Sequence, residues 1–151
     1  MSTTARNSAS ARKTNVALWV AQIILAGLFL FAGGFKLVAP IAQMTAQLPL
    51  PGWFIRFIGV AEFAGGLGLI LPSLLRIRPQ LTALAAQGLA IIMAGAVGVT
   101  LGLRLPGAAV PAIVGVLAAL VAYGRRNVAP ISARTRPVPS HAAAVRVARA
   151  A

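Results

Sequence analysis

The sequence predicts an all-α protein, an integral membrane four-helix bundle with up-down-up-down topology and both termini in the cytoplasm. Three observations lead to this prediction. The 151 residues are 59% hydrophobic and only 10% charged, a composition typical of membrane proteins. Four apolar stretches are long enough to cross a bilayer, which takes about 20 residues. Eleven of the fourteen basic residues fall in the two tails and the middle loop. These three places share one side of such a bundle, and the positive-inside rule puts that side in the cytoplasm.

The four spans are expected at about residues 16–39, 52–72, 80–103 and 107–123. Together they make one membrane domain over residues 16–123. The flanking segments 1–15 and 124–151 are basic and lack apolar periodicity, so both are expected to be disordered cytoplasmic tails. The apolar run that begins at Val16 exceeds the length of a signal-peptide core, so we expect it to remain as an uncleaved first span. The expected location is a cell membrane, the cytoplasmic membrane in a bacterium.

The connection between the first two spans, residues 40–51, is unusually apolar for a loop in water. We therefore expect it to lie in the membrane interface. Pro49 and Pro51 stiffen this connection and keep the first helix from continuing through it.

Several classes of chemistry are excluded by composition. The chain has no cysteine, one histidine and one acidic residue, which leaves no thiolate catalysis, no Cys-ligated metal and no self-sufficient acid/base pair. The expected set of cofactors therefore contains none held covalently or by metal ligands, and catalysis by this chain alone is not expected. Nucleic acid is not an expected partner despite the net charge of +13, because no aromatic residue interleaves the basic tail.

The single acidic residue, Glu62, is the leading candidate for a functional site. It lies ten residues after Gly52, so a helical rise of 1.5 Å per residue puts it at a depth of about 15 Å, the centre of the hydrocarbon layer. A charge at that depth costs roughly 2.5–3.5 kcal/mol. An ionisable residue retained there points to a function or to a specific partner.

Lys36, near the end of the first span, is the best candidate partner for Glu62. We expect the two to form a buried pair, with Arg56 and water contributing to the same intramembrane polar centre. An alternative stays open, in which Lys36 extends outward to the interface and a neutral Glu62 is only hydrogen-bonded.

Two sets of small residues and one pair of amides predict helix contacts. Gly59, Gly65 and Gly66 share the helix face of Glu62 and would let another helix approach closely. Ala94, Gly98 and Gly102 form a second stripe of small residues, on the third span. Gln22 and Gln87 share a depth, which favours an interhelical hydrogen bond and leaves a quinone or substrate contact as the alternative.

These residues also resemble a known family. The runs that carry the resemblance are FAGGFKLVAP at 31–40, LPLPG at 48–52 and GVAEFAGGLGLILP at 59–72. Their order and spacing are similar to those of the DoxX-like family of small four-helix membrane proteins, over about residues 16–123. The family pattern is a Gly–x–Lys–Leu at the end of the first helix and a Glu–x–x–Gly in the second, which corresponds here to Gly34, Lys36, Leu37, Glu62 and Gly65.

The resemblance implies an accessory or anchoring subunit of a membrane-associated oxidoreductase, of the type that supports thiosulfate oxidation with quinone as acceptor. A quinone and a redox protein are then the implied cofactor and partner. Two other functions stay open: a small proton-coupled transporter that uses Glu62 as its carrier, and a purely structural bundle. A homo-oligomer is a further candidate assembly, and anionic lipid head groups are expected to bind the basic tails.

Overall fold

The computed structural model describes residues 3–75, 77–78 and 80–131, and throughout this part the regular structure is helical. Four helices in it are long and apolar enough to cross a membrane, which confirms the predicted all-α membrane bundle. The cytoplasmic location of both termini stays a prediction. The elements are α1 (Thr3–Val38), α2 (Ile41–Gln47), α3 (Gly52–Leu75), α4 (Gln80–Gly102), α5 (Ala109–Tyr123) and a π-helical turn η1 (Gly124–Val128).

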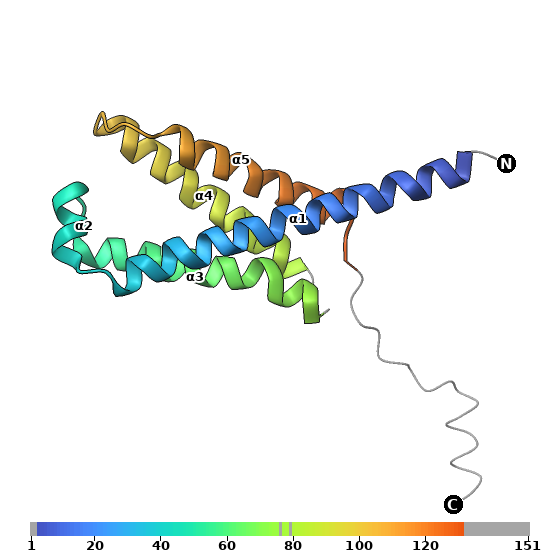
Figure 1. Ribbon diagram of the computed structural model, residues 1–151, viewed down its shortest axis with the longest axis horizontal. Coiled ribbons are helices and arrows are strands. Elements are labelled where there is room, and N and C mark those ends of the chain that lie inside the picture. The colour runs from blue at the N-terminus through green and yellow to red at the C-terminus, as the bar shows by residue number, and fades with distance from the viewer. Residues whose placement is uncertain (1–2, 76, 79, 132–151) are drawn as a thin grey trace, which may run out of the picture.

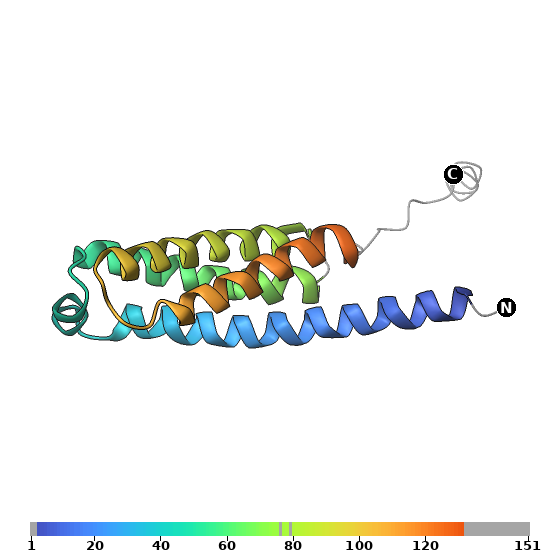
Figure 2. The same ribbon diagram turned by 90° about the horizontal axis from the view of Figure 1, so that it is seen from above.

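The four long helices run up, down, up and down, with α1 beside α3 and α4 packed against both α3 and α5 (Figure 1). One end of the bundle holds the first half of α1, the α3–α4 connection and η1, and we call it the basic end. The other holds α2 and the α4–α5 connection, and we call it the loop end. Figure 2 shows α5 crossing obliquely over the other helices toward the basic end.

Helix α1 begins well before the predicted start of the first span. It contains 36 residues, which at 1.5 Å per residue is about 54 Å and exceeds the roughly 30 Å hydrocarbon layer. Its first turns extend beyond the other helices (Figure 1). Residues 3–15, which we expected to form a disordered tail, are therefore helical in the structure. This segment contains no glycine or proline and several good helix formers, so nothing interrupts the helix that the apolar run begins.

Helix α3 continues past the predicted end of the second span at Pro72, which lies inside the helix. Proline is tolerated in membrane helices when neighbouring groups satisfy the polar atoms around it. At the next residue of α3, Ser73 Oγ lies 2.7 Å from Thr82 Oγ1 in a buried hydrogen bond that joins α3 to α4. A polar contact thus holds the two helices together where the chain reverses.

The fourth span also continues past its predicted end. Residues 124–128, expected to belong to the disordered tail, form η1, and the N–H of Ala129 donates to the carbonyl of Gly124 at 2.8 Å. Gly124 lets this turn lie against α1, because a Cβ there would be 2.6 Å from Leu18 Cδ2. The expectation of disorder for residues 132–151 lies outside the described residues.

The apolar core lies on the basic-end side of the bundle centre. Its largest fully buried apolar side chains are Leu25, Phe29, Leu69 and Leu89, contributed by α1, α3 and α4. The outer surface is also apolar, with large apolar side chains exposed on every long helix. A bundle that is apolar on both its inside and its outside is typical of a protein surrounded by lipid.

Residues 40–51 contain a short helix rather than only a loop. Thr45 Oγ1 donates to the carbonyl of Ile41 at 3.0 Å inside α2. The helix rests on the start of α3, where a Cβ on Gly52 would come within 2.7 Å of Ile41 Cγ1. Its location in the membrane interface stays a prediction.

Candidate functional site

Lys36 of α1 and Glu62 of α3 form an ion pair between neighbouring helices. Lys36 Nζ donates to Glu62 Oε2 at 2.7 Å. The carboxylate side chain is only 4% exposed and that of the lysine is 29% exposed. An ion pair in a medium of low polarity interacts much more strongly than one in water, and this attraction offsets the desolvation of the carboxylate. The structure thus has the paired state, not the state in which Lys36 extends away.

Arg56 lies close to this pair but binds the backbone. Its Nη1 donates to the carbonyl of Lys36, and its Nη2 donates to the carbonyl of Ala39 at 2.9 Å. The last carbonyls of a helix have no intrahelical partner. Arg56 supplies donors to two carbonyls at the end of α1, so its role is to cap this helix and fix the backbone that carries Lys36.

Close approach between α1 and α3 brings the paired side chains within reach of each other. A Cβ on Gly33 would lie 2.6 Å from the backbone nitrogen of Phe63 and 2.7 Å from the carbonyl oxygen of Gly59. Gly59 and Gly66 face α1 in the same way, whereas Gly65 faces Leu89 of α4. The three predicted glycines therefore serve two different helix contacts. Gly33, next to Gly34 of the family pattern, was not predicted. Its role depends on the backbone of α3 that faces it, which the sequence of α1 does not reveal.

A cavity of about 440 Å³ adjoins the ion pair on the loop-end side of the core. Lys36 and Glu62 are part of its wall, and the rest of the lining is almost entirely apolar. Side chains from all four spans and from the segment before α3 contribute, among them Leu28, Leu50, Phe57, Ile92, Ala96 and Val110. This arrangement suits an apolar molecule with one polar group.

A second buried polar cluster lies at the basic end and centres on Arg125. This residue is 4% exposed. Its Nε donates to Gln22 Oε1, and its Nη1 donates to Asn15 Oδ1 at 2.6 Å. The Gln22 Nε2 in turn donates to the carbonyl of Leu69 at 2.7 Å, and the ring of Trp19 lies 5.3 Å from the guanidinium carbon. The cluster connects α1, α3 and η1.

Gln22 forms interhelical hydrogen bonds, but not with Gln87. Gln22 is completely buried and bonds Arg125 and the backbone of α3, whereas Gln87 is exposed on α4. A shared depth places two residues at one level of the bundle but does not fix the direction of either side chain. Sequence reasoning missed Arg125 because nothing local distinguishes it from the exposed Arg126. The π-helical turn decides which of the two points inward.

The predicted stripe of small residues on α4 does not face another helix of this chain. Ala94, Gly98 and Gly102 are exposed, and a Cβ added to either glycine would meet no atom within 4 Å. Among the described residues, the stripe therefore contributes nothing to helix packing, in contrast to Gly59, Gly65 and Gly66.

These features define a multi-pass membrane protein of the four-helix type, with an ion pair and an apolar cavity within the bundle. Residues 20–122 match the profile of the DoxX-like family, and the chain belongs to this family. A search of the curated proteins and a search of the solved structures each found no match.

Proposed function

We propose that this DoxX-like protein is an accessory membrane subunit of a quinone-linked oxidoreductase and that it holds a quinone in the cavity at the loop end. The observation that carries the proposal is an apolar intramembrane cavity with one ion pair in its wall. Its volume of about 440 Å³ falls within the usual range for small-molecule sites, roughly 300–1,000 Å³.

The chemistry of the lining fits this class of ligand. A quinone has a flat apolar ring, an apolar tail and carbonyl oxygens that accept hydrogen bonds. Lys36 Nζ has three donor hydrogens and uses one on Glu62, so it can donate another to a quinone carbonyl. The apolar side chains around it accommodate the ring and the tail without leaving polar groups unpaired.

A redox partner is part of the proposal because this chain has few residues that hold redox groups. It has no cysteine and one histidine, so electrons would reach the quinone from a protein bound to this subunit. Chemical cross-linking in native membranes, followed by purification of the full chain, should recover a redox protein. Recovery of a homo-oligomer alone, without quinone, would contradict the subunit role.

The alternative function, a proton-coupled transporter, has weaker support. A carrier needs access to Glu62 from each side of the membrane in turn. Between Glu62 and the basic end lie Leu25, Leu69 and Leu89, each at most 2% exposed, and these buried apolar side chains do not favour proton transfer in that direction. Flux measurements in proteoliposomes address this alternative, because a proton carrier should lose its activity in the Glu62→Gln variant.

A binding experiment with two matched glycine variants tests the cavity. Trp53 is the reporter, because its ring is 5.6 Å from that of Phe54, which lines the cavity. In a Trp19→Phe background it is the only tryptophan of the chain. The full chain in nanodiscs is titrated with a short-chain benzoquinone, and quenching of Trp53 fluorescence reports binding.

The variants are Gly95→Leu and Gly98→Leu. Both glycines are exposed on α4 with no atom within 4 Å of an added Cβ, but only Gly95 lines the cavity. We expect Gly95→Leu to abolish saturable quenching and Gly98→Leu to leave it unchanged. Equal quenching in the two variants would mean that the quinone is merely dissolved in the lipid, and the cavity assignment would be wrong.

A further inference from the structure

Two consecutive arginines at the basic end point in different directions and line the same cavity. Arg125 is buried and Arg126 is exposed. Both contribute to a cavity of about 460 Å³, whose other polar side chains are the amides of Gln80 and Gln87. Every polar side chain in this lining can donate a hydrogen bond, and none of them is acidic.

Within the part of the chain that the structure describes, the buried guanidinium has no counter-ion. All of its hydrogen bonds go to neutral oxygens, namely those of Gln22, Asn15 and Ala129. Among the residues that the structure describes, its Nη2 is a buried polar atom without a hydrogen-bond partner. The sequence has no acidic side chain other than Glu62, and that carboxylate is paired with Lys36. A buried charge without a partner is costly, so an anion from outside the chain would complete this site.

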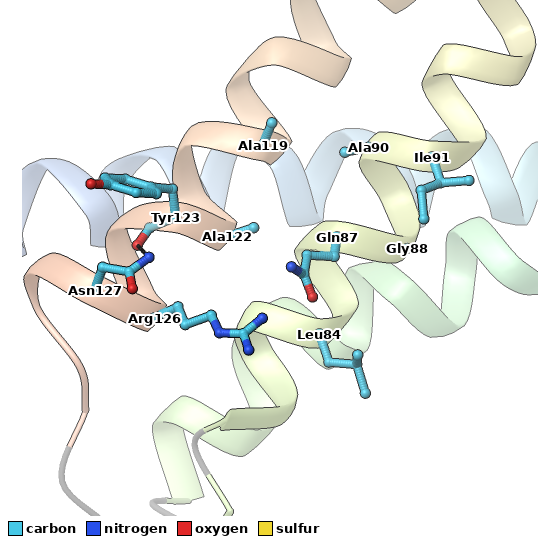
Figure 3. Close-up of a pocket in the computed structure, with 10 residues that line it drawn as sticks. All are labelled: Leu84, Gln87, Gly88, Ala90, Ile91, Ala119, Ala122, Tyr123, Arg126 and Asn127. Atoms are coloured by element: carbon cyan, nitrogen blue, oxygen red, sulfur yellow. Dashed lines mark hydrogen bonds between the residues drawn. The ribbon is translucent and has the colours of Figure 1, made fainter.

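An apolar groove of about 880 Å³ adjoins the cavity on the outer surface of the bundle, between α4 and α5. The two hollows share Leu84, Gln87 and Arg126. Figure 3 shows the Arg126 guanidinium extending from η1 toward α4, near Leu84 and Gln87. Farther along, the groove is lined by small residues, including Gly88, Ala119 and Ala122, and a Cβ on Gly88 would meet no atom within 4 Å.

We propose that this composite site binds one anionic phospholipid. Its phosphate lies in the basic cavity against Arg125 and Arg126, with the amides of Gln80 and Gln87 as further donors, and one acyl chain lies along the groove between α4 and α5. The continuity of a basic cavity with a lipid-facing apolar groove favours a phospholipid over a soluble anion. Arginine is well suited to this role, because its planar guanidinium can bind two phosphate oxygens at once.

The reporter for this site is Trp19, which stacks near Arg125. The full chain with Trp53→Phe, which leaves Trp19 as the only tryptophan, is placed in phosphatidylcholine nanodiscs. Brominated lipid with either a phosphatidylglycerol or a phosphatidylcholine head group is then added as the quencher. We expect the anionic lipid to quench Trp19 at a clearly lower mole fraction than the zwitterionic lipid.

Charge variants separate a specific site from a general surface potential. Arg126→Gln should raise the mole fraction of anionic lipid at half-quenching about fivefold, and folding should be unaffected because Arg126 is exposed. Arg78→Gln removes another exposed charge from the same end of the bundle, outside the lining, and should have a clearly smaller effect. Every variant keeps the arginines of the C-terminal segment, so their contribution is the same throughout.

Shape variants test the groove. Gly88→Leu fills it and should weaken quenching by the anionic lipid, whereas Gly98→Leu, on the same helix outside the groove, should not. Equal quenching by the two lipids, or equal effects of Arg78→Gln and Arg126→Gln, would overturn the proposal. A third result would also overturn it: millimolar inorganic phosphate displaces the lipid, and Gly88→Leu leaves the quenching of Trp19 unchanged. The site would then bind a soluble anion.

Discussion

The side chain of Gln22 accepts a hydrogen bond from Arg125, a residue 103 positions later in the chain. The same amide donates to the carbonyl of Leu69, so one buried side chain connects the first, second and last membrane helices. It also fixes the buried guanidinium that borders the proposed lipid site. Four predictions follow from this contact and from the geometry around the Lys36–Glu62 pair.

Replacing Gln22 with leucine should destabilise the bundle. The substitution leaves Arg125 Nε without its acceptor and removes the side-chain hydrogen bond to the Leu69 carbonyl, and a buried polar group left unpaired costs about 1–3 kcal/mol. The thermal unfolding midpoint in detergent should fall clearly. Gln87→Leu is the matched control because Gln87 is exposed, and its midpoint should stay close to that of the unsubstituted protein. Equal midpoints for the two variants would show that Gln22 does not hold the helices together.

Lys36→Met should cost more stability than Glu62→Gln. Removing one member of a buried ion pair typically costs about 3–5 kcal/mol, and the partial exposure of Lys36 should reduce this value. A lysine left alone can extend to the interface, whereas a carboxylate left alone stays buried. Chemical unfolding of the two single variants and of the double variant measures the asymmetry and the coupling between the residues. Additive effects in this cycle would show that the pair contributes no interaction energy.

Gly33→Ala should separate α1 from α3. The added methyl group would approach backbone atoms of Phe63 and Gly59 within 2.7 Å, and backbone cannot move aside as a flexible side chain can. Overpacking of this kind costs roughly 1–3 kcal/mol. In contrast, Gly27→Ala on the same helix meets no atom within 4 Å and should be neutral or stabilising by up to about 1 kcal/mol. Unfolding midpoints of both variants test this, and a neutral Gly33→Ala would contradict the close contact.

Arg56→Ala should loosen the loop end. The two carbonyls at the end of α1 lose their donors, so amide hydrogen exchange should increase in the last turn of α1. Arg104→Ala removes an exposed arginine near the same end of the bundle and should leave the exchange in α1 unchanged. If Arg56→Ala left the exchange unaltered, water would be an adequate substitute for the arginine, and the capping role would be wrong.

The fold class followed from features that a sequence displays directly. Four long apolar stretches and one buried acidic residue predict a membrane bundle whatever the details of side-chain packing, because backbone polar groups in lipid must be satisfied within helices. The element boundaries were less predictable. Pro72 was expected to end a helix but lies within α3. Helix α1 begins at Thr3, whereas the first span was expected to begin near Val16. Local sequence indicates where a helix can end, but not where it must end.

The Lys36–Glu62 pair of the candidate site was predictable from the charges in the sequence. With a single acidic residue in the chain, a nearby cation was the expected partner of Glu62, and depth alone favoured Lys36. The direction of side chains was not predictable in the same way. Neither the capping role of Arg56 nor the separation of Gln22 from Gln87 follows from depth, because both depend on helix rotation.

By itself, the sequence determined the number of spans, their up-and-down order and the need to neutralise Glu62, because these depend on composition and on spacing along one chain. The tertiary structure alone decided that Gly33 and Gly59 let α1 and α3 approach closely, that a cavity adjoins the ion pair, and that Arg125 rather than Arg126 points inward. These features arise from the rotation and close contact of helices whose residues are far apart in sequence. No local pattern encodes that geometry.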